Sequence, residues 1–360
     1  AVWTQIDPDR ALWIVVSILV VTCPCALGLA TPAALTTATG RLTQLGLLTT
    51  RGHALETLAV ATDLVFDKTG TLTTGRLSVV SVEVARAGVD AAAAARIAAA
   101  LEAGSEHPIA RALVAHAGAA TAAEAVRNLP GRGVEGRVDG VAYRLGAPAF
   151  AAPAVASPAA NEGMSWVALG DEAGLVAWFA LADTVREDAA ASLAALRRLG
   201  IRLHLVSGDG AGAVAAVAAR LGIADARAGA LPEDKLAYVR ELQARGAVVG
   251  MVGDGINDAP VLAAAQVSVA MGEGTDVAQA AADMVMLGGR LDTLVHGVQL
   301  ARKTRRIVRQ NLGWALAYNL VAIPAAALGH VTPWLAGIGM SASSLLVVLN
   351  ALRLAEGRES

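Results

Sequence analysis

Cysteine and lysine are scarce in this sequence, and each scarcity narrows what the chain can do. The two cysteines, Cys23 and Cys25, are separated only by Pro24 inside an apolar segment. Such a pair excludes a disulfide framework and leaves metal binding or redox chemistry as its function. No basic face interleaved with aromatic residues is visible and the net charge is -2, so no nucleic-acid partner is expected. Only three of the 29 basic residues are lysines: Lys68, Lys235 and Lys303.

Charged residues of either sign are also few. They make up 17% of the chain, against 55% hydrophobic residues and a mean hydropathy of +0.53. This balance is too apolar for an ordinary soluble protein and too charged for a protein that lies wholly in a membrane. The composition therefore predicts a chain with both membrane-spanning and soluble parts.

The first long apolar run covers residues 11–38, and no charged residue follows it before Arg41. About 20 such residues suffice to cross a bilayer. Pro24 removes a backbone donor near the middle of the run, and a broken membrane helix is tolerated where it lines a site. Two thiols at this break favour an ion site, although cysteine also occurs as a small hydrophobic residue in apolar helices. By the positive-inside tendency, Arg41 and Arg51 place the residues after about 40 in the cytoplasm.

The segment 67–71, Asp-Lys-Thr-Gly-Thr, directly follows the apolar run 64–66. An apolar run that ends in a carboxylate and a glycine turn is typical of a buried strand at the carboxyl edge of a parallel sheet, where α/β folds place their chemistry. Asp67 is therefore a candidate nucleophile. An isolated aspartate here would more often only cap a turn, but further parts of a site occur downstream.

Residues 63–300 have a soluble composition and show two patterns. The first contains short strands joined by hairpin turns, which favours an antiparallel sheet flanked by helices. Its expected strands are 77–84, 133–138, 141–145, 165–169 and 175–181, its helices are 91–101 and 108–117, and 148–158 is loop or frayed helix. The second alternates helices with apolar strands, which predicts a parallel sheet covered on both faces. Its expected helices are 185–199, 213–221 and 232–243, and its strands 201–206, 247–252, 267–270 and 283–286. The first pattern is expected to form a cap inserted into a Rossmann-like domain.

Polar residues suited to phosphoryl chemistry follow the strands of the second pattern. A hydroxyl and glycine amides can hold phosphoryl oxygens, and a lysine at a helix start can neutralise a transferring phosphoryl group. The residues expected to do this are Ser207, Gly208, Asp209 and Lys235. Two of the three lysines, Lys68 and Lys235, fall in this proposed site, where a compact ammonium ion is useful.

Two further acidic residues, Asp254 and Asp258, lie four positions apart after strand 247–252, at an expected helix start. Carboxylate oxygens are the ligands that Mg2+ prefers. The sequence therefore predicts a Mg2+ site at this sheet edge.

Two apolar runs, about 311–331 and 334–354, are expected to form a hairpin of membrane spans after a basic stretch, 301–309. No acidic or basic side chain lies in the interior of either run, and Met340 and Ser344 are four apart, hence on one helical face. Thiolates, a thioether and neutral oxygens suit Cu+, whereas Zn2+ more often takes a carboxylate. Singly, such serines and asparagines are more often helix-packing residues. The residues expected to hold Cu+ are Cys23, Cys25, Tyr318, Asn319, Met340, Ser343 and Ser344.

Together these motifs resemble the heavy-metal P-type ATPases, and in particular their copper-translocating branch. The resemblance rests on five segments: Cys23-Pro24-Cys25, residues 67–71, the Ser-Glu-His-Pro segment 105–108, Ser207-Gly208-Asp209 and residues 253–258. The last two spans also match that branch, with Tyr318-Asn319 in one and Met-Ser-Ala-Ser-Ser, 340–344, in the other.

The resemblance implies a multi-domain α/β fold with membrane helices. A haloacid-dehalogenase-like Rossmann phosphorylation domain would contain an inserted α+β nucleotide-binding domain, and three transmembrane helices would anchor both. The expected segments are a first membrane helix with its cytoplasmic exit (1–60), the phosphorylation domain (61–76 and 182–300), the nucleotide-binding domain (77–181), and two further membrane helices with a C-terminal tail (301–360).

It also implies an aspartyl-phosphate mechanism. Asp67 would attack the γ-phosphate of ATP, Lys235 and Ser207 would bind phosphoryl oxygens, and Mg2+ would be held by Asp67, Thr69 and Asp254. Related phosphatases place an acid two residues after the nucleophile, where this chain has Thr69, so the phosphoenzyme should persist. In the insertion, Glu102 and His107 would contact adenine, and Gly131 and Gly133 would let the backbone approach the nucleotide. As a bare glycine pattern, residues 131–136 could equally form a plain hairpin turn.

The resemblance has gaps. No Thr-Gly-Glu occurs and only three spans are expected, so the chain is expected to be the C-terminal portion of a pump that lacks the actuator domain and earlier spans. Gly210 also stands where the family usually has asparagine. The expected function is ATP-driven export of Cu+, with Ag+ as a further cargo, across the plasma (inner) membrane, with lipid around the spans and Cu+ delivered free or by a copper chaperone. The alternatives are a Zn2+ or Cd2+ pump, a membrane-tethered phosphatase, and an inert product that only binds metal or nucleotide.

Overall fold

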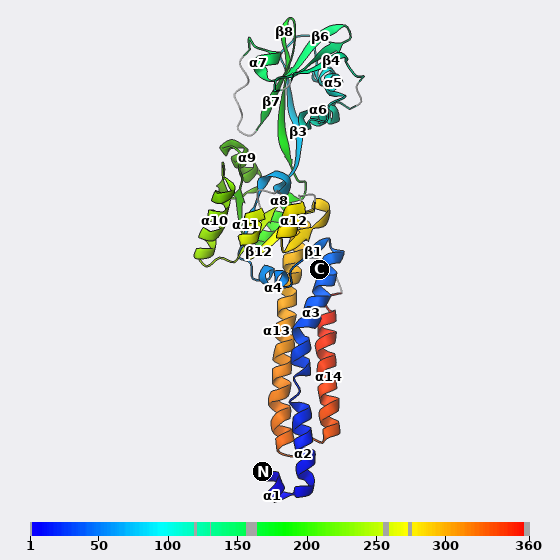
Figure 1. Cartoon of the computed structure of the whole chain (residues 1–360), viewed down its shortest axis with the longest axis vertical. Coiled ribbons are helices and arrows are strands. Elements are labelled where there is room, and N and C mark those ends of the chain that lie inside the picture. The colour runs from blue at the N-terminus through cyan, green and yellow to red at the C-terminus, as the bar shows by residue number, and fades with distance from the viewer. Residues whose placement is uncertain are drawn as a thin grey trace.

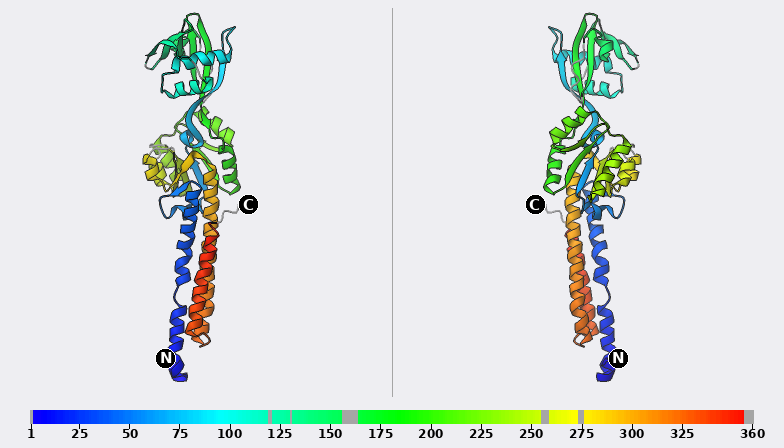
Figure 2. Two further views of the ribbon diagram at one scale, coloured as in Figure 1. Left: turned by 90° about the vertical axis from the view of Figure 1, so that its right-hand side faces the viewer. Right: turned by 90° about the vertical axis from the view of Figure 1, so that its left-hand side faces the viewer.

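The computed structural model describes residues 2–118, 121–129, 131–155, 164–254, 259–272 and 276–355. The chain is elongated and has three tiers, which follow one another along its long axis (Figures 1 and 2). A helical bundle forms one end, a sheet with helices on its faces forms the middle, and a second sheet forms the other end. The fold class expected from the sequence, α/β domains joined to membrane helices, is the one observed.

The bundle consists of long helices that run side by side. They are α2 (Pro8–Val21), α3 (Cys25–Gln44), α13 (Asp292–Ala327) and α14 (Pro333–Leu352), preceded by the short α1 (Val2–Ile6). The carboxylate of Asp7 accepts a hydrogen bond from the Arg10 N–H, which caps the start of α2. Pro24 lies in the break between α2 and α3, where the sequence predicted an interrupted helix.

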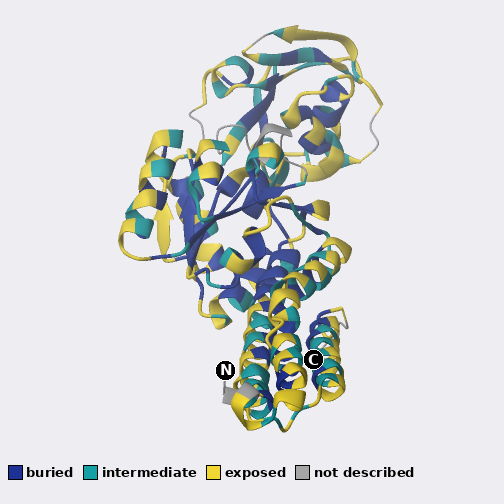
Figure 3. Ribbon diagram, turned by 60° about the horizontal axis from the view of Figure 1, so that its bottom comes forward, coloured by how far each residue is buried: buried dark blue, intermediate teal, exposed yellow. Residues whose placement is uncertain are grey.

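Two helical segments of the described chain are long and apolar enough to cross a membrane, Pro8–Gln44 and Pro333–Leu352. The third expected span, 311–331, begins in the second half of α13, which packs against α2, α3 and α14. Many residues of the bundle are exposed (Figure 3). They include large apolar side chains such as Leu12 (70% exposed), Leu320 (73%) and Trp334 (82%). Extended apolar surface of this kind marks contact with a partner or with lipid.

The middle tier is a seven-stranded sheet in the order β1-β13-β12-β11-β2-β9-β10. All neighbouring strands are parallel except β1 and β13. Its strands are β1 (Leu47–Thr49), β2 (Asp63–Phe66), β9 (Arg202–Val206), β10 (Asp225–Arg227), β11 (Val249–Gly253), β12 (Val267–Met271) and β13 (Met284–Met286). Its helices are α4 (Ala54–Leu58), α8 (Ala189–Arg198), α9 (Ala211–Leu221), α10 (Pro232–Ala244), α11 (Ala259–Ala264) and α12 (Asp276–Ala281). Strand β2 lies inside the sheet, between β11 and β9, and every residue in it is buried, so its carboxyl end opens away from the two outer strands of the sheet.

The far tier is a six-stranded sheet in the order β3-β8-β7-β6-β5-β4, with all neighbours antiparallel. Its strands are β3 (Thr73–Val84), β4 (Glu124–Leu129), β5 (Gly133–Val138), β6 (Val141–Gly146), β7 (Ser165–Asp171) and β8 (Gly174–Val185). Helices α5 (Ala91–Glu102) and α6 (Pro108–Ala117) share one hydrophobic core with this sheet, and the short α7 (Pro148–Ala151) packs on β6 and β7. The long pair β3 and β8 joins this tier to the middle one (Figure 1).

The expected helix 185–199 is wrong in its first residues. Strand β8 continues to Val185, which pairs with Thr73, and α8 begins only at Ala189. The short strands β1, β4 and β10 were not expected. In β4 and β10 almost every residue is exposed, so neither has the apolar alternation that identifies a strand.

Candidate functional site

Asp67 lies at the carboxyl end of β2 and is only 5% exposed. Its N–H donates to the carbonyl of Val252 on β11 (2.9 Å), which continues the sheet hydrogen bonding up to the site. Lys235, in the first turn of α10, places Nζ 2.5 Å from Oδ1 of Asp67. The structure thus brings together a buried carboxylate and a buried ammonium ion that are 168 positions apart.

The chain turns sharply after Asp67, through the helical turn η1 (Lys68–Leu72). Gly70 within it has φ +70°, a conformation that favours glycine. A Cβ added at Gly70 would lie 1.5 Å from Oδ2 of Asp254, so the carboxylate of Asp254 lies directly against this turn. Asp67 and Asp254 therefore meet at the same sheet edge, as the ends of neighbouring parallel strands.

Gly70→Ala is expected to lower phosphoenzyme formation by roughly 10²-fold or more, because the new methyl group must displace the Asp254 carboxylate and the backbone resists positive φ. The measurement is incorporation of label from ATP, with the melting temperature as a check on folding. Gly88→Ala is the matched control, since its φ is +85° but an added Cβ meets nothing within 4 Å. Equal losses of labelling in the two variants would show that backbone strain alone explains the effect.

Arg186 holds this turn and was not recognised in the sequence. Its buried guanidinium donates to the carbonyls of Thr71 (2.9 Å), Gly70 (2.8 Å) and Gly289 (2.7 Å). Three backbone carbonyls on one planar group orient the turn rigidly. Most arginines of the described chain are exposed, and Arg186 differs from them by being buried, which the sequence does not show. The one feature of the sequence that could have indicated its role is its position directly after strand β8.

Asp209, which follows β9, collects donors from both sides of the site. It accepts from Nζ of Lys68 (2.9 Å), from Oγ of Ser207 (2.7 Å) and from Oγ1 of Thr69 (3.2 Å). Burial raises the pKa of Asp209, but the hydrogen bonds from Lys68, Ser207 and Thr69 outweigh it and hold the pKa below its usual range. Lys68 is thus paired with Asp209, whereas Lys235 is paired with Asp67. Gly208, between Ser207 and Asp209, is exposed.

Asp183, near the end of β8, is a second residue that the sequence did not reveal. Its Oδ2 accepts a hydrogen bond from Thr73 (2.5 Å), while its buried Oδ1 has no partner among the described residues. Burial raises the pKa of Asp183, and the hydrogen bond from Thr73 and the charge of Lys68 oppose this only in part. This half-buried carboxyl group beside Lys68 and Asp209 adds a further proton-binding group to the edge of the site.

The donor set at this edge fits Mg2+. Asp67 and Asp254 offer hard carboxylate oxygens, the ligands of this ion. Over the part of the chain that the structure covers, no three side chains of His, Cys, Asp or Glu form a metal-binding group. A site here would therefore need further oxygens from the backbone, water or a phosphate. Asp258, the other expected Mg2+ ligand, lies outside the described residues.

The residues expected to bind the nucleotide lie in the far tier. His107 begins α6, where its Nδ1 accepts a hydrogen bond from the N–H of Ile109 (3.3 Å), and it lines a cavity of about 670 Å³ together with Ser105 and Val134. Glu102 is buried at the end of α5 and does not line this cavity. Burial raises the pKa of Glu102, although Ser105 and His107 act in the opposite direction.

Gly131 precedes β5 and Gly133 begins it, and both have positive φ. An added Cβ at Gly133 would lie 2.1 Å from the carbonyl oxygen of Leu145, because Gly133 pairs closely with Gly146 of β6. An added Cβ at Gly131 would meet nothing within 4 Å. The close approach of β5 and β6 therefore explains why glycine is needed at position 133. At Gly131 there is open space beside the turn.

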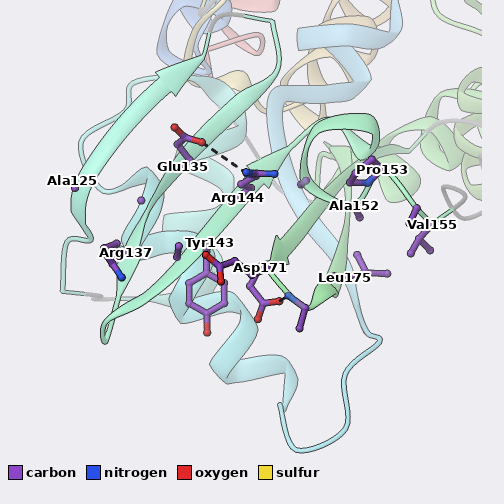
Figure 4. Close-up of a pocket in the computed structure, with 17 residues that line it drawn as sticks. Ala125, Glu135, Arg137, Tyr143, Arg144, Ala152, Pro153, Val155, Asp171 and Leu175 are labelled. Carbon is purple, nitrogen blue, oxygen red and sulfur yellow. Dashed lines mark hydrogen bonds and ion pairs between the residues drawn. The ribbon is translucent and has the colours of Figure 1, made fainter.

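A larger cavity of about 750 Å³ lies elsewhere on this sheet, along β4 to β7 and beside α7 (Figure 4). Glu135 and Arg144 line it side by side on the neighbouring strands β5 and β6, with Nε of Arg144 3.9 Å from Oε2 of Glu135. None of the expected nucleotide-binding residues lines it.

In the bundle, the helix break and the last two helices meet at one small cavity of about 10 Å³. Five of the seven residues expected to hold a transported ion line it: Cys23, Tyr318, Asn319, Met340 and Ser343. The other two, Cys25 and Ser344, do not line it and are partly buried. Ser343 is fixed by a hydrogen bond from the Trp314 indole (3.1 Å), and the cavity is too small for a water molecule. The thioether and hydroxyl groups thus lie close to the thiol of Cys23, which is itself exposed at the helix break.

A central parallel sheet with Asp67 at its carboxyl edge, an inserted second sheet and a lysine on the carboxylate define a haloacid dehalogenase-like hydrolase. Residues 64–266 match that family, to which the chain belongs. Within it, the chain is a member of the P-type ATPases, as the resemblance predicted.

One relative is the "Probable copper-exporting P-type ATPase V" of Mycobacterium tuberculosis (strain CDC 1551 / Oshkosh), which is 43% identical over 368 residues, 98% of this chain and 48% of that protein. Another is the "Copper-exporting P-type ATPase" of Mycobacterium tuberculosis (strain ATCC 25618 / H37Rv), 44% identical over 359 residues, 97% of this chain and 47% of that protein. The solved structure of a zinc-transporting PIB-type ATPase matches with a TM-score of 0.86 and 37% identity, over 93% of this chain and 56% of that one. The chain spans about half the length of the curated relatives it matches.

Proposed function

We propose that this chain forms the ATP-consuming and cargo-binding part of a pump that exports Cu+, and also Ag+, through a phosphoenzyme on Asp67. The observation that carries the proposal is the contact between Asp67 and Lys235 at the sheet edge, beside Asp254. A buried ammonium ion 2.5 Å from a buried carboxylate neutralises charge where a phosphoryl group would transfer.

In the proposed step, one carboxylate oxygen of Asp67 attacks the γ-phosphorus of ATP. The bond from that phosphorus to the bridging oxygen breaks, its electron pair leaves with ADP, and an aspartyl phosphate remains. Lys235 and the hydroxyl of Ser207 would contact the transferring oxygens. When bound, Mg2+ supplies charge neutralisation, and Asp67, Asp254 and the Thr69 backbone are the groups proposed to hold it, with Asp258 as an expected further ligand.

In this proposal the phosphoenzyme is long-lived because of the residue at position 69, Thr69. Its side chain is a hydroxyl whose hydrogen bond goes to Asp209, so this position offers no carboxylate to activate water. Slow hydrolysis suits a pump, in which release of phosphate has to wait for transport. In this proposal segments 61–76 and 182–300 form the phosphorylation domain, and segment 77–181, with Glu102, His107, Gly131 and Gly133, binds the nucleotide.

The cavity at the helix break supports the choice of cargo. It gathers sulfur from Cys23 and Met340 with neutral oxygens and no carboxylate, a set that suits Cu+ better than Zn2+. The alternative is a Zn2+ or Cd2+ pump, which the solved zinc-transporting relative favours. In the proposal, Cu+ reaches this site free or from a copper chaperone.

We place the membrane helices of segments 1–60 and 301–360 in the plasma membrane, and the cytoplasmic exit after α3 and the ATP-binding tiers in the cytoplasm. Two apolar helical segments support this orientation, together with Arg41 near the end of the first segment and Arg51 beyond it.

The test is incubation of the chain with labelled ATP and Mg2+. An acid-stable label that hydroxylamine removes is expected, because an acyl phosphate resists acid quenching and reacts with hydroxylamine. A parallel assay with small phosphate esters addresses the phosphatase alternative, which requires fast, metal-independent turnover of those esters. Absence of the label, or its presence only as a transient during fast ester turnover, would contradict the proposal.

A further inference from the structure

A cavity of about 580 Å³ lies between α13 and the turn that joins α4 to β2. One of its walls is uncharged and consists of Ala59, Val60, Ala61, Thr62 and Gly200. The other consists of four arginines: Arg302, Arg305, Arg306 and Arg309. No acidic side chain of the described chain lines it. This arginine cavity therefore concentrates positive charge beside an uncharged surface.

The arginines follow the helical repeat, so they share one face of α13. The opposite face, with Ala301 and Ile307, packs into the core below the seven-stranded sheet. Arg302 is held in place, since its Nη1 donates to the carbonyl of Leu199 at the end of α8. The other three are exposed, and within the described ranges none of them has a carboxylate partner at ion-pair distance.

The same face of α13 becomes apolar directly beyond the arginines. It continues through Gly313, where an added Cβ would meet nothing within 4 Å, to Leu316 (68% exposed) and Leu320 (73%). At 1.5 Å per residue, Leu316 is about 10 Å along the axis from Arg309. The polar layer of a bilayer is roughly 5–8 Å thick on each side of the hydrocarbon. When Leu316 contacts hydrocarbon, Arg309 is thus close to the depth of the phosphate groups, and Arg305 and Arg306 lie about 5–6 Å further out along the helix.

We propose that the arginine cavity binds the phosphate of an anionic phospholipid headgroup, with the acyl chains lying on the face that contains Gly313, Leu316 and Leu320. Guanidinium groups bind phosphate oxygens in pairs, and the uncharged wall at Ala59 to Thr62 leaves room for a neutral headgroup part. A free phosphate ion has the same oxygen chemistry but no apolar chain. The exposed apolar stripe next to the cavity therefore favours the lipid.

The test is native mass spectrometry of the chain purified in micelles that contain equal amounts of phosphatidylglycerol and phosphatidylcholine with identical acyl chains. The wild-type chain is expected to retain phosphatidylglycerol over phosphatidylcholine by roughly tenfold or more. Changing the three exposed arginines to glutamine (R305Q/R306Q/R309Q) should bring this preference to within about twofold of unity. The lysine counterpart (R305K/R306K/R309K) should show an intermediate preference, because it keeps the charge and loses the paired hydrogen bonds of the guanidinium group.

The matched control is R96Q/R220Q/R240Q, which removes the same charge from exposed positions outside the cavity. It should keep the wild-type preference, and equal melting temperatures would show that all variants are folded. The proposal is overturned by equal retention of the two lipids by the wild-type chain, or by an equal loss of preference in the control. It is also overturned if millimolar inorganic phosphate displaces the phosphatidylglycerol, since the cavity would then take a soluble anion.

Discussion

Asp67→Asn is expected to abolish phosphoenzyme formation, with labelling from ATP reduced by roughly 10³-fold or more. The amide has almost the same shape as the carboxylate, but its oxygen is a poor nucleophile and it carries no charge to pair with Lys235. The variant therefore changes the reacting group and leaves the sheet edge otherwise intact. The measurement is acid-stable, hydroxylamine-sensitive label after incubation with ATP and Mg2+.

Asp63→Asn is the matched control, because Asp63 lies four residues earlier on the same strand and is fully buried. Burial raises the pKa of Asp63, but hydrogen bonds from Arg202, Thr62 and His204 lower it to about 2. A carboxyl group with a lowered pKa stabilises the fold above its unfolded pKa, and this stabilisation is lost as the pH falls through about 2. Asp63→Asn should thus melt earlier at neutral pH and still become labelled. Label of wild-type strength on Asp67→Asn would remove Asp67 from the mechanism.

The double variant Cys23→Ser/Cys25→Ser is expected to weaken Cu+ binding by roughly 10²-fold or more, because a hydroxyl is a hard donor and Cu+ prefers soft sulfur. Cys23 lines the cavity together with Met340, so the variant leaves one thioether and neutral oxygens. The measurement is a competition titration against a coloured Cu+ chelator under reducing conditions, with a parallel Zn2+ titration.

Ser341→Ala is the control, since Ser341 is exposed on the helix that carries Met340 and does not line the cavity. It should bind Cu+ as the wild-type chain does. Tighter binding of Zn2+ than of Cu+ by the wild-type chain would replace copper with zinc as the cargo. Unchanged Cu+ affinity in the cysteine variant would place the ion elsewhere.

The meeting of Asp67 with Lys235 and Asp254 could be anticipated from the sequence for a simple reason. Each residue directly follows an apolar strand or begins a helix, and parallel strands end at the same edge. The partner of each group could not be anticipated. Lys68 is adjacent to Asp67 in sequence but pairs with Asp209, whereas Asp67 pairs with Lys235. Distances across a turn depend on backbone angles that residue types only restrict.

Arg186 and Asp183 show a second limit of predicting site residues from the sequence. Both matter through burial, and burial is set by which elements pack around them. Arg186 is 8% exposed because β8 delivers it beneath the turn after Asp67, whereas a sequence shows only one arginine among many. Strand β4 was not predicted because it is an exposed edge strand, and such a strand needs no alternation of apolar residues. The residues that line the cavity in the bundle were easier to predict from the sequence, because the apolar helices contain few polar or sulfur-containing residues.

Helix α13 is continuous from Asp292, whose N–H donates to Asp188 beside the seven-stranded sheet, to Ala327 in the bundle. Over its 36 residues it forms a single rod about 54 Å long. A stiff rod converts rotation at one end into translation at the other, so a tilt of about 10° at the sheet would move its far end by about 9 Å. Tyr318 and Asn319 lie about three-quarters of the way along this helix, so a rotation of about 10° at the sheet would shift them by several times the radius of the cavity that they line.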